Sequence, residues 1–93
     1  MVLDFKMSRV TVFSTGICPI CDKTKNLLKK WGIPYNEARL DTGDMSIRKE
    51  FADKTQGARM VPQILIDGEW IGGFSELTEL HMDDKLDYLM VQQ

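Results

Sequence analysis

Two thiols near the amino end of this sequence are its clearest candidates for chemistry. Cys18 and Cys21 are the two cysteines of the chain, and Pro19 and Ile20 lie between them. A thiolate attacks a disulfide through a mixed-disulfide intermediate, so two thiols at this spacing can break a disulfide and close one between themselves. The pair therefore predicts thiol–disulfide exchange.

The neighbouring residues predict that the pair sits where a strand passes into a helix. The apolar, β-branched run at 10–13 favours a strand, and Pro19 favours the first position of a helix, where its missing N–H would be unpaired anyway. We therefore expect Cys18 at the N-cap. Helix N-termini and Cys-x-x-Cys motifs lower a thiol pKa from about 8.5 to roughly 3.5–7.5. Lys23 and Lys25, close by in sequence, are expected to stabilise the same thiolate.

The two sulfurs are predicted to have different roles. Cys21 lies at helical spacing from three residues of the face that a helix would bury, Thr24, Leu28 and Trp31. Cys18 is therefore the predicted attacking sulfur. Cys21 is the predicted resolving sulfur, which displaces the substrate from Cys18 by closing an internal disulfide.

Two plainer interpretations of the pair are less well supported. A structural zinc site needs four ligands, whereas the chain offers two cysteines and one histidine, His81, so no metal is expected. A structural disulfide across so short a loop would constrain the unfolded chain little. A Cys-x-x-Cys motif between a strand and a helix is typical of a redox site.

The bulk composition predicts one globular domain. The chain has 93 residues, 43% of them hydrophobic, and a net charge of −2, which gives no electrostatic reason to expect a nucleic-acid partner. No apolar run approaches the ~18 residues of a membrane span, and the N-terminus lacks the pattern of a secretory signal. We expect a leader at 1–7, a domain at 8–93, and a monomer in the reducing cytoplasm, where cysteine pairs are more often catalytic than structural.

The order of the predicted elements indicates an α/β domain. A helix joins the first two strands, which favours parallel pairing, and Asp67-Gly68 favours a hairpin between the last two. The result is a mixed four-stranded sheet flanked by helices, β-α-β-α-β-β-α with an extra C-terminal helix. We expect Ser75 to cap the third helix at its start, His81 to help cap its end, and Asp83 to cap the last helix. The predicted strands are 9–14, 35–40, 61–66 and 69–71, and the predicted helices are 19–31, 45–55, 76–81 and 83–91.

Two further segments have residue types suited to ligand binding. Pro62 belongs at the start of a strand, because it cannot donate to a sheet ladder. A cis Val61–Pro62 bond would turn the Val61 backbone outward toward an extended peptide, although only about 5–6% of such bonds are cis. The glycines at 72–73 permit close backbone approach, and the helix start at Ser75 offers N–H groups to a carboxylate. A plain strand-to-helix turn is the alternative for this second segment.

These motifs, in this order and spacing, resemble those of the glutaredoxin family over residues 8–91. The matching segments are Cys18-Pro19-Ile20-Cys21, Val61-Pro62-Gln63-Ile64 and Ile71-Gly72-Gly73-Phe74-Ser75-Glu76-Leu77. The resemblance implies the thioredoxin fold, a cis Pro62, glutathione as the electron-donating cosubstrate, and disulfide-containing or glutathionylated proteins as substrates, ribonucleotide reductase among them. It also implies that Val61 holds the cysteinyl backbone of glutathione. Gly73, Ser75 and Glu76 would hold its γ-glutamyl end.

Two positions depart from the family pattern. Thr15 stands where members often carry a lysine for the glycine carboxylate of glutathione, and Ile20 stands where an aromatic residue is usual. Gln56 and Arg59 are expected to share the missing lysine's task. A hydrogen bond to a charged group contributes roughly 1.5–3 kcal/mol, so an uncompensated loss would weaken glutathione binding about tenfold or more.

Two other functions remain compatible with the motifs. One is a redoxin of the same fold that takes electrons from thioredoxin reductase. The glycine-rich segment before Ser75 favours glutathione over that alternative. The other is an iron–sulfur carrier in which Cys18 and glutathione bridge a cluster between two subunits. By the family resemblance, Pro19 after the first cysteine disfavours the carrier.

Overall fold

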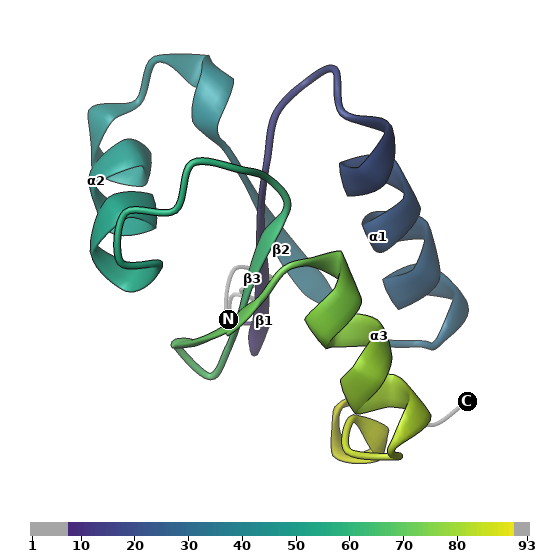
Figure 1. Ribbon diagram of the computed structural model, residues 1–93. Helices are drawn as coiled ribbons and strands as arrows, with labels where there is room; N and C mark the ends of the chain where they lie inside the picture. The colour runs from purple at the N-terminus through teal and green to yellow at the C-terminus, as the bar shows by residue number, and fades with distance from the viewer. Residues whose placement is uncertain (1–7, 91–93) are drawn as a thin grey trace, which may run out of the picture.

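A mixed four-stranded sheet forms the middle layer of the computed structural model, which describes residues 8–90 (Figure 1). The strands run in the order β2-β1-β3-β4. β1 pairs in parallel with β2 and antiparallel with β3, which pairs antiparallel with β4. The predicted α/β class and mixed pairing are confirmed. The elements are β1 (Val10–Ser14), α1 (Pro19–Lys30), β2 (Tyr35–Arg39), the 3-10 turn η2 (Leu40–Thr42), α2 (Met45–Lys54), β3 (Gln63–Ile66), β4 (Glu69–Gly72), α3 (Phe74–Met82) and the 3-10 turn η3 (Asp87–Leu89).

Helices cover both faces of the sheet, and each face has its own buried cluster. In Figure 1, α1 and α3 lie together on one side of the strands and α2 lies on the other. On the α1–α3 side, Leu28 and Leu77 are fully buried against Val12. On the α2 side, Phe13 and Phe51 meet edge to face with ring centroids 5.2 Å apart. β1 is therefore apolar on both faces because it lies inside the sheet with a helix layer on either side.

The hairpin between β3 and β4 forms as predicted. Asp67 and Gly68 both have positive φ, 54° and 83°, as the two central residues of a tight hairpin turn require. β3 begins later than predicted, at Gln63 rather than at residue 61. Pro62 has no N–H for the ladder, so regular pairing starts after it.

Two predicted caps of α3 are wrong. Ser75 lies inside the helix, and Gly73 is its N-cap. The Glu76 carboxylate accepts the Gly73 N–H at 2.8 Å, which satisfies a donor at the helix start and lets the helix begin two residues earlier. His81 does not cap the other end with its side chain; it stacks on Trp31 of α1, with ring centroids 3.8 Å apart and planes 15° apart.

The predicted C-terminal helix is also wrong in the described part of the chain. Asp83 is the C-cap of α3 rather than the start of a new helix, and Asp84 has a φ of 59°. This left-handed residue interrupts helical geometry, and only the short turn η3 follows. Leu86 and Leu89 are nevertheless buried. The predicted leader at 1–7 and the end of the predicted helix at Val91 lie outside the described residues.

Candidate active site

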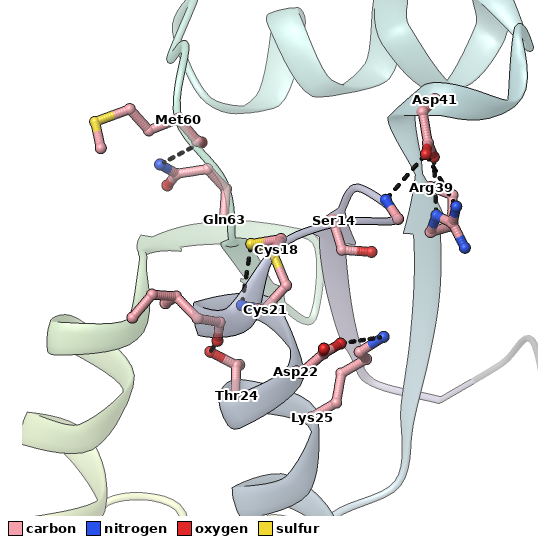
Figure 2. Close-up of a disulfide and its surroundings, with 12 residues drawn as sticks. Ser14, Cys18, Cys21, Asp22, Thr24, Lys25, Arg39, Asp41, Met60 and Gln63 are labelled. Carbon is pink, nitrogen blue, oxygen red and sulfur yellow. Dashed lines mark hydrogen bonds and ion pairs between the residues drawn. A yellow bond between two sulfur atoms is a disulfide. The ribbon is translucent and has the colours of Figure 1, made fainter.

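The two cysteines occupy the first turn of α1 and form a closed disulfide (Figure 2). Cys18 is the N-cap, with Pro19 as the first helical residue, as predicted. The Cys21 N–H donates to Cys18 Sγ at 3.1 Å, so the outer sulfur already receives a helix N-terminal hydrogen bond. Cys21 is fully buried, whereas Cys18 is only partly buried. This asymmetry agrees with the predicted attacking and resolving roles.

One of the two lysines near the pair, Lys25, is engaged elsewhere. Lys25 Nζ lies 2.7 Å from Glu37 Oε2 on β2 and 3.6 Å from Asp22. The same Glu37 oxygen accepts the hydroxyl of buried Ser14 at 2.7 Å. Partial burial acts to raise the pKa of Glu37, but the hydrogen bonds from Lys25 and Ser14 outweigh it and leave that pKa lowered. The charge of Lys25 is thus balanced by carboxylates instead of being directed to the Cys18 thiolate.

A side-chain bracket fixes the loop that leads to Cys18. The Gly16 N–H donates to Asp41 Oδ2 at 2.9 Å, and Arg39 holds both oxygens of that carboxylate at 2.8 and 2.9 Å (Figure 2). These hydrogen bonds keep the pKa of Asp41 well below its usual range. A Cβ on Gly16 would lie 2.6 Å from Arg39 Nη2, so a side chain at this position would displace the ends of Arg39 and Asp41 from the arrangement seen here. Asp41 is not among the residues that the sequence motifs pointed to.

We expect Asp41→Asn to be less stable than the wild-type protein at pH 7. The difference should shrink as the pH falls below about 4. The folded-state pKa of Asp41 is depressed, so its stabilising contribution is complete above the unfolded-state pKa of about 3.9 and is lost as the pH falls from there toward the folded-state value. Urea unfolding at pH 7 and at pH 3 measures the two differences. Asp53→Asn, which removes the partner of exposed Lys49 on α2, is the matched control. A constant difference between the Asp41 variant and wild type at both pH values would contradict the prediction.

The Val61–Pro62 peptide bond is cis, as the resemblance implied. Gln63 pairs with Phe13 across the sheet, which brings the loop before β3 to the same end of the sheet as the cysteine loop. Figure 2 shows Met60 and Gln63 on one side of the disulfide and the Asp41 bracket on the other. The N–H and C=O of Val61 have no hydrogen-bond partner within residues 8–90. They are therefore available to an extended peptide.

The turn from β4 into α3 packs against the cis-proline loop. A Cβ on Gly73 would lie 3.0 Å from the Pro62 carbonyl oxygen, so the two segments touch through their backbones. Gly72 has a φ of 114°, which glycine adopts readily. The first N–H groups of a helix lack intrahelical partners. At this junction, those groups are the N–H groups of Phe74 and Ser75. Glu76 is close by, but its carboxylate is already bonded to the Gly73 N–H.

An open hollow of about 440 Å³ borders this turn. Trp70 Nε1–H donates to Gln63 Oε1 at 2.8 Å, and Gln63 Nε2–H donates to the Met60 carbonyl at 3.1 Å. The Trp70 indole thus holds the residue that follows the cis proline. The hollow is lined by Gln63, Trp70, Ile71, Gly72, Gly73 and Glu76.

The remaining predicted site residues are less closely joined to the pair. Ile20 is 45% exposed in the first turn of α1, and Thr15 is partly buried in the cysteine loop. Gln56, with a φ of 56°, and Arg59 are exposed in the connection from α2 to β3. The described contacts do not join either of them to the disulfide, so their assignment to a ligand stays a prediction.

The described residues 8–90 lack both a cluster of metal-ligating side chains and a membrane-spanning helix. No group of three or more histidine, cysteine or acidic side chains in this range could hold a metal ion. None of the helices in the same range has the length and apolar content required to cross a membrane.

Comparison with known proteins identifies the family. The family model described as Glutaredoxin matches residues 10–71. The chain belongs to the glutaredoxin family. A glutaredoxin of Pseudomonas aeruginosa is 37% identical to this chain over 84 residues, which cover 90% of this chain and 98% of the relative. Glutaredoxin-C2 of Arabidopsis thaliana is 38% identical over 85 residues, which cover 89% of this chain and 76% of the relative.

Solved glutaredoxin structures have the same fold. A buckwheat glutaredoxin–glutathione complex superposes with a TM-score of 0.76 at 30% identity, covering 92% of this chain and 79% of that one. A dithiolic glutaredoxin of Trypanosoma brucei brucei gives a TM-score of 0.75 at 31% identity, covering 94% of this chain and 91% of that one. The predicted thioredoxin fold is confirmed. Family, fold and cysteine pair together show a thiol–disulfide oxidoreductase.

Proposed function

We propose that this protein uses glutathione to reduce protein disulfides and glutathionylated proteins through the Cys18–Cys21 dithiol. One observation carries the proposal. The outer sulfur, at the N-terminus of α1, lies at the same end of the sheet as the unpaired backbone of Val61 and the start of α3. This arrangement provides a nucleophile beside an edge that can hold an extended peptide.

Glutathione would lie across this edge with its sulfur at Cys18. The Val61 backbone would pair with the cysteinyl residue, and the N–H groups of Phe74 and Ser75 would bind the γ-glutamyl end, next to Gly73 and Glu76. The buckwheat relative, similar over 92% of this chain, is a complex with glutathione. At the other end of glutathione, we assign its glycyl carboxylate to the region of Thr15, Ile20, Gln56 and Arg59.

The reaction with a glutathionylated protein takes two exchanges. The Cys18 thiolate attacks the glutathionyl sulfur, a Cys18–glutathione disulfide forms, and the substrate thiolate leaves and takes up a proton. The thiolate of a second glutathione then attacks the bound glutathionyl sulfur. Glutathione disulfide forms and the Cys18 thiolate is restored. Pro19 and the Cys21 N–H keep Cys18 at the helix start throughout.

A protein disulfide follows a second route that needs both cysteines. Cys18 attacks one substrate sulfur, and the other substrate sulfur leaves as a thiolate. The Cys21 thiolate then attacks Cys18, which releases the reduced substrate and closes the Cys18–Cys21 disulfide seen here. Two glutathione molecules reduce this disulfide and leave as glutathione disulfide. Ribonucleotide reductase, whose turnover oxidises a dithiol, is a suitable substrate, and we propose a cytoplasmic monomer without a resident metal.

A coupled assay tests the source of electrons. We expect the oxidised protein to turn over with glutathione, glutathione reductase and NADPH, and to show little turnover with thioredoxin reductase and NADPH. The Val61 backbone and the start of α3, where glutathione is proposed to bind, predict the first coupling. They provide no reason to expect direct binding of thioredoxin reductase. NADPH absorbance under each condition gives the two rates. Faster turnover with thioredoxin reductase would replace the proposal with the redoxin alternative.

A further inference from the structure

Lys23 connects the cysteine helix to the start of α3. It lies two residues after Cys21, is exposed on α1, and places its Nζ 5.2 Å from the centroid of the Phe74 ring. Phe74 is the first residue of α3 and directly follows Gly73. The ammonium group therefore lies close to the junction where the γ-glutamyl end of glutathione is proposed to bind.

The charge of Lys23 is not balanced by a carboxylate within residues 8–90. Lys25 pairs with Glu37, and Lys49 pairs with Asp53, whereas no ion pair involves Lys23. Contact with an aromatic face attracts an exposed ammonium but leaves its net charge in place. Lys23 is thus a positioned cation whose charge remains available to an anion.

The other charged group at this junction is already engaged. Glu76, the acidic residue in the first turn of α3, gives its Oε1 to the Gly73 N–H at 2.8 Å and does not pair with Lys23. A carboxylate bound to the N–H groups of Phe74 and Ser75 would meet the positive end of the helix dipole on one side. The ammonium over the Phe74 ring would lie on another side.

We propose that Lys23 is a specificity-determining residue that favours γ-glutamyl thiols by attracting their α-carboxylate to the start of α3. This inference rests on the proposed function and adds to it one residue from the cysteine helix. An α-carboxylate is carried on the γ-glutamyl group of glutathione and of γ-glutamylcysteine. Cysteinylglycine lacks that group, so Lys23 should not affect its use.

Three variants separate charge from packing. Lys23→Met keeps the unbranched stem against Phe74 but removes the charge, since methionine also contacts aromatic rings favourably. Lys23→Arg keeps the charge. Lys30→Gln removes one positive charge from the exposed end of the same helix and is the matched control.

Steady-state kinetics with one peptide linked by a disulfide to each of the three thiols in turn, at a fixed concentration of glutathione as reductant, test the inference. The thiol carried by the peptide is the one that occupies the site when Cys18 attacks its sulfur. We expect Lys23→Met to raise the KM for the peptides that carry glutathione or γ-glutamylcysteine by about three- to tenfold with little change in kcat. Lys23→Arg should restore most of that loss, added salt should reduce the difference, and Lys30→Gln should behave as wild type. With the peptide that carries cysteinylglycine, Lys23→Met and wild type should have the same kinetics.

The outcomes distinguish this inference from the function on which it rests. An unchanged KM for the glutathionylated peptide in Lys23→Met, when wild type prefers that peptide, would overturn the role of Lys23 alone. An equal rise with the cysteinylglycine-linked peptide would show a general effect on the site and would also overturn it. A wild-type protein with no preference for the glutathionylated peptide over the cysteinylglycine-linked one would overturn the proposed function itself.

Discussion

Cys18→Ser should lose glutathione-dependent disulfide reduction by on the order of a thousandfold or more, because a serine hydroxyl cannot form the mixed disulfide on which both routes depend. Cys18 is the accessible sulfur, and it receives the helix N-terminal hydrogen bond from Cys21. The glutathione reductase-coupled assay with a small glutathionylated peptide measures the loss. Circular dichroism of the variant checks that the fold is retained.

The matched control is the inner cysteine. Cys21→Ser should retain the reaction with the glutathionylated peptide, because glutathione itself resolves the Cys18 intermediate. It should lose reduction of an intact protein disulfide, which needs the second sulfur to release the substrate. Substantial activity in Cys18→Ser, or loss of both reactions in Cys21→Ser alone, would contradict the assigned roles.

The second large effect is on stability. Phe13→Ala should lower the free energy of unfolding by about 3–5 kcal/mol, since it removes a large buried ring and leaves a cavity. Phe13 is fully buried and meets Phe51 edge to face at 5.2 Å. A small domain has a total stability of about 5–15 kcal/mol, so the variant would lose a large part of it. Urea unfolding followed by circular dichroism gives the change.

Met45→Ala is the control for the loss of an apolar side chain without a cavity. Met45 begins α2 and is 72% exposed, so its removal should change stability by about 0.5 kcal/mol or less. Phe13 also pairs with Gln63 across the strands. We therefore expect disulfide reduction by Phe13→Ala to fail at a lower temperature than in wild type. Equal stabilities of the two variants would show that the Phe13–Phe51 contact is not a core contact in solution.

The parts of the fold that the sequence predicted well depend on short-range rules. Pro19 after Cys18 gave the helix start, and Asp67-Gly68 gave the hairpin, because each is decided by backbone preferences within a few residues. The errors occurred at helix ends, where several residues a few positions apart could end or begin the helix. Gly73 became the cap of α3 because Glu76 reaches back to its N–H, and Asp84 in the left-handed region interrupts the predicted last helix.

The candidate site likewise has a part that the local sequence predicts and a part that it does not. The nucleophile and its partner were predicted from four consecutive residues, but the groups that position them were not. Gly16 and Asp41 are 25 residues apart in the chain, and their contact depends on the register between β1 and β2. The contact between Lys23 and Phe74 depends on how α1 packs beside α3. Such pairs have no local signature in a single sequence.

The unequal burial of the two sulfurs has a consequence for the proposed reduction of a protein disulfide. Cys21 has no exposed surface, so a large partner would be captured through Cys18 and not through the inner thiol. The displacing sulfur is carried on the same helical turn, at an effective concentration far above that of any free thiol in solution. Under the proposed mechanism, release of the partner by Cys21 would therefore be a first-order event whose lifetime is a property of this chain.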